Sequence, residues 1–116
     1  LQPYLATDWR GQFEEQMQRR LEIWEYILPV RLAASLRRFQ SKFLLEEYCQ
    51  FLEIERASLK SVLPESVILD DVLFAALDEA MGIACWINLR MDQGLSPLAA
   101  EAVVRRIANA LITSAE

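Results

Sequence analysis

Hydrophobic residues recur at helical spacing along almost the whole chain, and they are densest between Asp70 and Gln93. Their positions in this stretch form two adjacent stripes: Leu73, Leu77, Ala80, Ala84, Ile87 and Met91 in one, and Phe74, Met81 and Cys85 in the other. A helix that covers one side of a small core needs only a single apolar stripe. We therefore predict one helix over residues 70–93 that is buried from two directions, with a second copy of the chain as the second cover.

The same periodicity predicts three helical segments ahead of this one. A helix over residues 8–28 carries one apolar face at steps of three and four: Phe13, Met17, Leu21, Trp24 and Leu28. Pro29 has no N–H donor and disfavours a helical residue before it, so we expect a kink or a restart, then a short helical piece over residues 30–38. Ser41 can cap a third helix over residues 42–60, with this buried side: Leu45, Tyr48, Cys49, Leu52 and Leu59.

Stop and start signals delimit the last helix. We expect Gly94 to end the preceding helix in the left-handed conformation, and Ser96 followed by Pro97 is a favourable N-cap and first residue. The last helix then carries Val103, Ile107, Ala110 and Leu111. Since no strand pattern or internal repeat competes with these segments, we predict an all-α fold, a single helical-bundle domain of about five helices over residues 1–116.

Composition and charge narrow the class of protein. The chain has 116 residues, of which 53% are hydrophobic, and its net charge is −5, with the basic residues in scattered pairs. DNA binding needs a basic surface, so we expect no DNA contact from this chain itself. Charges interrupt every apolar run before the ~18 residues that a membrane helix needs, and the first residues do not resemble a signal peptide. Cys49 and Cys85 fall within apolar helical patterns, which suits reduced thiols in a cytoplasmic protein.

Candidate residues for chemistry are sparse. The chain contains no histidine, so it lacks the commonest general base and transition-metal ligand. It has no glycine-rich phosphate loop and no nucleophile elbow. Paired carboxylates such as Asp78 and Glu79 are expected to form solvated faces. We therefore expect neither an enzyme nor a metal or cofactor site.

Aromatic, methionine and cysteine side chains are the better candidates for function, because several helices can place them around one interior. Either they fill a core, or they line an apolar cavity in which a few polar groups orient a small ligand. For the second alternative, the candidate ligand contacts are Leu21, Trp24, Leu28, Tyr48, Leu52, Phe74, Asp78, Met81 and Cys85. Asp78 lies one helical turn from Phe74 and from Met81, so it either points into the cavity, where it would favour a cationic ligand, or stays exposed.

Gly82 indicates a surface for a second copy of the chain. Glycine within a helix costs about 1 kcal/mol relative to alanine, and close approach of another helix is one reason to tolerate it. The predicted homodimer interface consists of Glu79, Gly82, Ile83, Trp86 and Arg90 on this helix, with Val103, Ile107 and Ala110 on the last helix. Two chains would then form a four-helix bundle. The alternative is that the last helix of the same chain covers Trp86.

Two segments carry a recognisable combination of residues. The first is RLEIWEYILPVRLAASLRRFQS, with Arg20, Leu21, Trp24, Glu25, Pro29, Arg31 and Ala33. The second precedes the last helix, with Trp86, Leu89, Arg90, Asp92, Gln93, Gly94, Leu95, Ser96, Pro97 and Ala100. Together these segments resemble the C-terminal regulatory domain of tetracycline-repressor family transcription factors. The similarity extends over most of the chain, from about Gln12 to Ile112.

The resemblance implies an all-helical domain whose last two long helices form a homodimeric four-helix bundle. It also implies a pocket among the preceding helices for a small, usually apolar effector. The family's DNA-reading helix-turn-helix would lie N-terminal to Leu1, outside this chain. Effector binding would then change the spacing of the two DNA-reading helices by a population shift, with the first long helix, bent at Pro29, as the transmitter.

Two classes of function therefore compete. One is an effector-sensing and dimerisation domain of a transcriptional regulator, which needs a cavity. The other is a purely structural helical dimerisation module with a filled core and no ligand. A dry, close-packed centre around Trp24, Tyr48, Phe74 and Met81 would contradict the first class.

Overall fold

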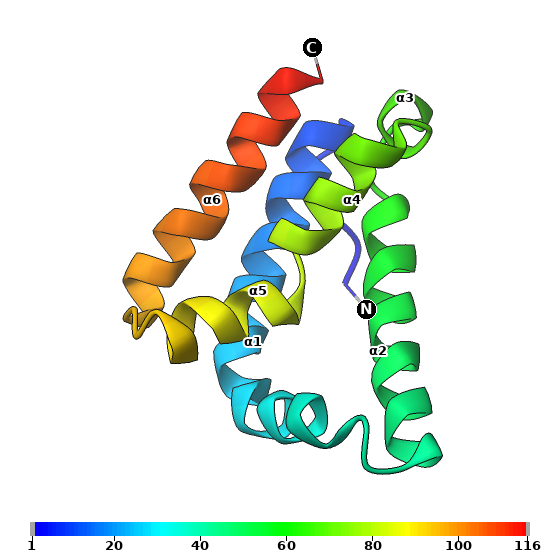
Figure 1. Ribbon diagram of the computed structural model, residues 1–116. Coiled ribbons are helices and arrows are strands. Elements are labelled where there is room, and N and C mark those ends of the chain that lie inside the picture. Colours follow the sequence, from blue (N-terminus) through cyan, green and yellow to red (C-terminus); the bar gives the residue numbers. More distant parts are fainter. Residues whose placement is uncertain (1, 116) are drawn as a thin grey trace.

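A computed structural model describes residues 2–115, and the regular structure of these residues is entirely helical. In chain order the helices are α1 (Trp9–Arg37), α2 (Lys42–Lys60), α3 (Glu65–Ile68), α4 (Asp71–Ala80), α5 (Ile83–Ile87), the π-helical turn η1 (Asn88–Asp92) and α6 (Pro97–Ser114). α2 runs alongside α1, and α6 runs alongside α4 (Figure 1). The prediction of an all-α single domain is confirmed.

α1 is longer than predicted, because it continues through Pro29 to Arg37. Proline fits the helical φ angle and removes only its own hydrogen bond to the carbonyl four residues earlier, which permits a bend without ending the helix. The part of α1 after Pro29 turns away from the first part and leads toward the start of α2 (Figure 1). The chain therefore bends at the predicted place, but residues 30–38 do not form a separate helix.

The predicted single helix over residues 70–93 is wrong, because the chain leaves the helical conformation at Gly82. α4 ends at Ala80, and Gly82 has extended backbone angles (φ −105°, ψ 157°). The segment formed by α5 and η1 then continues at 46° to α4. A methyl group at Gly82 would lie 2.9 Å from the carbonyl oxygen of Asp78, so the break has room only for glycine unless the backbone shifts.

The break explains why apolar residues occur on more than one side of this stretch. α4 buries Leu73 and Leu77, whereas α5 buries Ile83 and Trp86, and both sets belong to the same hydrophobic core. The two pieces face that core from different directions because the chain changes course between them. The single chain therefore buries most of this stretch by itself, whereas Ala84 and Met91 of the predicted stripe stay exposed.

The predicted helix boundaries at Ser41, Gly94 and Ser96 are confirmed. The Ser41 hydroxyl accepts a hydrogen bond from the Leu44 amide (3.1 Å), and the Ser96 hydroxyl accepts one from the Ala99 amide (3.2 Å). Gly94 has φ +68°, the left-handed conformation that L residues with side chains rarely adopt. Asp8 stands at the N-cap position of α1, but its side chain makes no capping hydrogen bond there.

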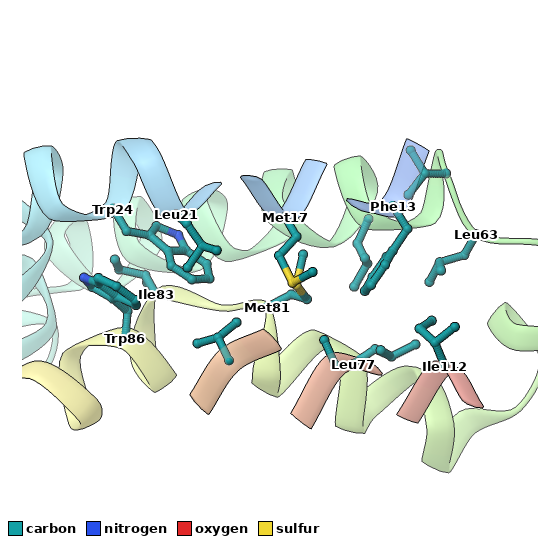
Figure 2. Packing of buried hydrophobic residues seen from close by; sticks show 14 of the residues in the cluster. Phe13, Met17, Leu21, Trp24, Leu63, Leu77, Met81, Ile83, Trp86 and Ile112 are labelled. Atoms are coloured by element: carbon teal, nitrogen blue, oxygen red, sulfur yellow. The ribbon is translucent and has the colours of Figure 1, made fainter. Parts of the chain in front are cut away.

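The core is formed where α1 meets α4 and α5. Figure 2 shows a row of α1 side chains facing a row from the other two helices. The members of the two rows are Phe13, Met17, Leu21 and Trp24 on α1, and Leu77, Met81, Ile83 and Trp86 opposite. The rings of Trp24 and Trp86 meet at one end, with centroids 5.5 Å apart and planes tilted by 39°. Such aromatic contacts contribute about 1 kcal/mol beyond the area that they bury.

The buried faces of α2 and α6 differ in part from the predicted ones. On α2, Tyr48 and Leu59 are buried, but Leu45 and Cys49 are exposed, because α2 packs mainly against α1 and needs a narrower apolar stripe. On α6 the fully buried row is shifted by one residue from the predicted row, and it consists of Ala100, Val104, Ala108 and Ile112. The predicted row Val103, Ile107, Ala110 and Leu111 lies at the edge of the core or outside it.

Among residues 2–115, no single helix is both long and apolar enough to cross a membrane. α4 together with the α5–η1 segment meets that criterion only as a pair, across the 46° bend.

Candidate ligand-binding site

A cavity of about 700 Å³ lies between α1 and α2. Protein cavities that bind small molecules commonly have volumes of roughly 300–1,000 Å³. Most of its wall is apolar and comes from Ile23, Trp24, Ile27, Phe51 and Ile54. Ile23 and Ile54 are 53% and 69% exposed, so the cavity opens to solvent beside them. The cavity is therefore large enough, and accessible enough, for a small molecule.

One end of the cavity is polar because α1 contributes Arg20 and α2 contributes Glu55. The Arg20 guanidinium donates to the carbonyl oxygen of Met81, at the break between α4 and α5, and to the carbonyl oxygen of Glu55 (2.7 Å). Its Nη1 lies 3.9 Å from Oε2 of the Glu55 carboxylate. Arg20 thus connects α1, α2 and the helix break from a buried position.

Burial dominates the electrostatics of this pair. It raises the pKa of the Glu55 carboxyl, while the positive charge of Arg20 acts in the opposite direction. The backbone N–H of Ile83 and the indole of Trp24 also favour the charged form of Glu55, and so they also act to lower its pKa. Burial likewise lowers the pKa of Arg20, opposed by the negative charge of Glu55. The Glu55 carboxylate is therefore only partly compensated by the groups around it.

Gln16 completes the polar end. Its Nε2 donates to the Tyr4 hydroxyl (2.9 Å) and to the carbonyl oxygen of Ser58 (2.8 Å). Its Oε1 is buried and has no hydrogen-bond partner, and the same holds for Oε1 of Glu55. Both residues line the cavity.

Polar contacts fix α1 against α2 along the length of the cavity. Beyond the apolar wall, the Arg31 guanidinium lies 4.3 Å from the centroid of the Phe51 ring and pairs with Glu47 (2.8 Å). Together with the bonds from Gln16 and Arg20 to the backbone of α2, this contact holds the two helices apart at a fixed spacing. The cavity is thus part of a constrained structure.

The segment ahead of α1 forms another part of the wall, through Gln2 and Tyr4. Glu15 holds this segment in place, because its carboxylate accepts hydrogen bonds from the backbone amides of Leu5 (2.8 Å) and Ala6 (2.7 Å). These two bonds hold the pKa of Glu15 below its usual value. The segment is therefore attached to α1 by its backbone.

Of the nine predicted ligand contacts, the structure brings only Trp24 to this cavity. Leu21, Leu28 and Met81 are buried in the core, and Tyr48 is buried on α2. Leu52 and Cys85 are half-buried and pack against the core. The predicted cavity around Met81 is thus filled, because the break at Gly82 folds α5 onto α1. Trp24, Tyr48, Phe74 and Met81 are all buried, so the effector site predicted among them is contradicted. An effector-sensing function therefore depends on the different cavity between α1 and α2.

Phe74 and Asp78 belong to a second, smaller hollow. Its volume is about 380 Å³, and Arg56 and Lys60 also line it. The Asp78 carboxylate forms an ion pair with Arg56 (2.9 Å) at this partly exposed position. Asp78 therefore does not point into the predicted cavity and lies half-buried at the surface, paired with Arg56.

Sequence reasoning missed most of the cavity wall. The available signal was a second row on α1, beside the core-facing stripe and at the same helical spacing: Gln16, Arg20, Ile23 and Ile27. Because two polar residues precede the two isoleucines, this row has the pattern of a helix face that is partly polar and lies at the surface. The structure shows that this row faces α2 across the cavity.

The predicted dimer residues on α5 and η1 lie within the chain's own contacts. Ile83 and Trp86 are 0% and 1% exposed, so the prediction that they pack against a twin helix is wrong. The Trp86 indole donates to Oε2 of Glu25 (3.0 Å), and Arg90 donates to both oxygens of the same carboxylate, with Nη2 2.6 Å from Oε1. Gly82 is half-buried at the helix break.

The predicted dimer residues on α6 remain accessible. Ile107 and Ala110 are exposed and Val103 is half-buried. With Ala99 they form a row at steps of four, four and three along one flank of α6, which we call the α6 flank. Glu79 and the 81% exposed Val72 lie on α4, the helix against which α6 packs. The chain leaves Ile107 and Ala110 of the α6 flank exposed, whereas Ala99 and Val103 are half-buried beside the core.

Comparison of the chain with protein-family models, with curated proteins and with solved structures finds no match.

Proposed function

We propose that this chain is the effector-binding and dimerisation domain of a transcriptional regulator of the tetracycline-repressor type, acting in the cytoplasm. Its effector is a small, mainly apolar molecule held between α1 and α2. We assign DNA binding to a helix-turn-helix domain outside this chain, since the chain has a net charge of −5 and DNA binding relies on basic side chains. The cavity of about 700 Å³, apolar along its wall and polar at one end, carries this proposal.

The arrangement of the two resembling segments supports the proposal. Trp24 and Glu25 come from the first segment, and Trp86 and Arg90 come from the second. In the fold, Trp24 packs on Trp86, and Glu25 binds both Trp86 and Arg90. The residues that carry the resemblance thus contact one another, which gives a structural reason for them to occur together.

α1 is the element through which the proposed effector acts. It forms one wall of the cavity through Ile23 and Trp24, and its next residue, Glu25, binds α5 and η1. A ligand that prefers one spacing of α1 and α2 therefore also biases the position of α1 against the rest of the domain. In the intact regulator this bias would be passed to the DNA-binding domain.

A purely structural dimerisation module is the second candidate. The α6 flank favours it, because an uncovered apolar row at helical spacing is typical of a bundle seam. This candidate needs no cavity. Binding of a ligand in the cavity would therefore distinguish the effector-binding domain from the structural module.

Native mass spectrometry of the purified protein tests both parts of the proposal. We expect the mass of two chains, with an added small mass per chain when an apolar library is present. A monomer at micromolar concentration would contradict dimerisation. A dimer that takes up no compound would favour the structural module.

A matched pair of variants locates the ligand. Ala57→Trp adds a large side chain at the cavity wall, and Ala33→Trp makes the same change at an exposed position of α1 outside the wall. We expect Ala57→Trp to weaken binding of any hit by about tenfold or more, since it fills space that the ligand needs. Ala33→Trp should leave the affinity unchanged. Equal effects of the two substitutions would place the ligand elsewhere.

A further inference from the structure

The segment ahead of α1 is the least buried part of the cavity wall, and we call its residues 2–7 the strap. Gln2 and Tyr4 of the strap line the cavity together with residues of α1 and α2. None of residues 2–7 is buried; Tyr4 and Ala6 are half-buried and the others are exposed. Segments with few buried apolar contacts open locally at a low cost in free energy. The strap is therefore a part of the wall that can detach while the helices keep their places.

Backbone contacts attach the strap to α1 near its tip. The Glu15 carboxylate accepts hydrogen bonds from the amides of Leu5 and Ala6. Nε2 of Gln12 donates to the carbonyl oxygen of Ala6 (3.1 Å). These bonds involve the backbone of the strap, so they fix its path along α1 whatever side chains it carries.

Tyr4 connects the strap to both helices that enclose the cavity. Its ring centroid lies 4.5 Å from the guanidinium of Arg19 on α1. Its hydroxyl accepts a hydrogen bond from Nε2 of Gln16, and the same nitrogen donates to the carbonyl oxygen of Ser58 on α2. A change in the spacing of α1 and α2 at this point therefore also changes the attachment of the strap.

Gly11 provides the space that the strap occupies on α1. A Cβ atom at Gly11 would lie 2.5 Å from Cβ of Ala6 and 2.6 Å from Oδ1 of Asp8. Glycine within a helix costs about 1 kcal/mol relative to alanine, so the helix by itself gains nothing from it. The docked strap needs this glycine, because a larger residue would push Ala6 away from α1.

We propose that docking of the strap on α1 and binding of the effector are coupled, so that the docked strap is the ligand-binding form of the cavity. This coupling concerns the cavity of the proposed function and rests on it. A ligand that contacts Gln2 and Tyr4 stabilises the docked strap. Because coupling between two equilibria is reciprocal, release of the strap weakens binding of the ligand by the same factor.

An apolar fluorescent dye without charge, N-phenyl-1-naphthylamine, is the probe for the cavity. It is titrated into the unaltered protein and into Ala57→Trp, the variant that fills the cavity, and the difference between the two titrations reports binding in the cavity. Amide hydrogen exchange of Leu5 and Ala6 is then measured by NMR with and without saturating dye. We expect the dye to slow exchange at both amides about fivefold or more in the unaltered protein, and not in Ala57→Trp.

Gly11→Ala tests the reciprocal effect. The added methyl group displaces Ala6, so the amides of Leu5 and Ala6 should exchange faster. Affinity for the dye should fall about fivefold or more, by the same coupling. The helix content measured by circular dichroism should not fall, because alanine favours a helix more than glycine does. Weaker binding with an intact helix separates release of the strap from a general loss of structure.

A matched pair of tyrosine variants tests the attachment through Gln16. Tyr4→Phe removes the hydroxyl that Gln16 binds, and Tyr26→Phe makes the same change at an exposed position of α1 outside the cavity. Tyr4→Phe should weaken dye binding by up to about fivefold, the equivalent of one neutral hydrogen bond, and should speed exchange of the Leu5 amide. Tyr26→Phe should change neither quantity.

The outcomes distinguish this inference from the proposed function. Suppose that the dye binds in the cavity, as its loss in Ala57→Trp would show. Unchanged exchange at Leu5 and Ala6 on binding, or unchanged affinity in Gly11→Ala, would then overturn the coupling and leave the cavity as an effector site. Dye binding that is absent, or that Ala57→Trp does not weaken, would overturn both. Slower exchange on binding together with weaker binding in Gly11→Ala would support both.

Discussion

At the scale of single residues, Glu25 joins three parts of the fold through one carboxylate. It lies on α1 and accepts hydrogen bonds from Trp86 on α5 and from Arg90 on η1. Nη1 of Arg90 in turn donates to the carbonyl oxygen of Leu95 (2.6 Å), in the turn before α6. The bonds from Arg90 are the largest cause of the lowered pKa of Glu25, and they also raise the pKa of Arg90. This cluster ties the start of α6 to α1.

Glu25→Gln should lower the free energy of unfolding by about 1 kcal/mol near pH 7, a modest loss because the ion pair is partly solvated. The folded-state pKa of Glu25 is depressed. Its stabilisation is therefore fully present above the unfolded value of about 4.3 and is lost as the pH falls through the lower folded value. Urea unfolding of both proteins between about pH 7 and pH 3 measures this, and the difference should shrink on acidification. A difference that is independent of pH would contradict the role of the charge.

Only some of the residues that line the cavity could be predicted from the sequence. Trp24 was assigned to a ligand site from its residue type, and it does line the cavity. Gln16, Arg20 and Glu55 were not assigned, because a sequence does not tell a buried polar residue from a solvated one at the same helical spacing. Their roles depend on what lies across from them on the other helix.

At the scale of elements, the residues that cap helices were easier to predict than the point at which the chain changes direction. α2 occupies the predicted range 42–60, and α6 begins after Ser96 as predicted. These signals are local, since a cap depends on a side chain and the amides of its own first turn. The break at Gly82 is stabilised from outside its own helix, by the bond from Arg20 to the carbonyl oxygen of Met81. The periodicity of hydrophobic residues along the chain gives no information about that contact.

Gly82→Ala should destabilise the protein by about 1 kcal/mol, a typical value for a strained single substitution. The added methyl group would lie 2.9 Å from the carbonyl oxygen of Asp78, so backbone atoms must shift to accept it. The midpoint of urea unfolding measures the loss. Ala75→Ser, at an exposed position of α4, serves as the control and should change the midpoint little. An unchanged or higher midpoint for Gly82→Ala would mean that the break tolerates a side chain.

At the scale of the whole molecule, the chain completes its own core and leaves apolar side chains exposed in several places. The core joins α1, α4, α5 and α6, so no second copy is needed for burial of Trp86. The exposed apolar surfaces include two that bear on function, the wall of the cavity and the α6 flank. The fold class could be predicted because it follows from the sum of many periodic positions. The locations of the two surfaces could not, because each depends on the direction in which neighbouring helices run.

Ile107→Glu should convert a dimer to a monomer at micromolar concentration without unfolding the chain. Ile107 is 41% exposed on the α6 flank, so a charge there is tolerated in the single chain but not in an apolar seam. Sedimentation velocity measures the mass, and circular dichroism checks the helix content. Phe43→Glu, at a 75% exposed position of α2, is the control and should remain dimeric. Persistence of the dimer in Ile107→Glu would place the interface on another surface.

The attachment of residues 2–6 to α1 has a practical consequence for anyone who handles this protein. Gln2 and Tyr4 are part of the cavity wall, and Tyr4 also holds the Gln16 amide. A purification tag or fluorescent label fused ahead of residue 1 would therefore lie close to that wall. Trimming the first seven residues would open the cavity at one end and remove the Tyr4 hydroxyl from Gln16, which would keep its bond to the carbonyl oxygen of Ser58. Labels for binding measurements therefore belong after α6, whose end lies at the outer tip of the molecule (Figure 1).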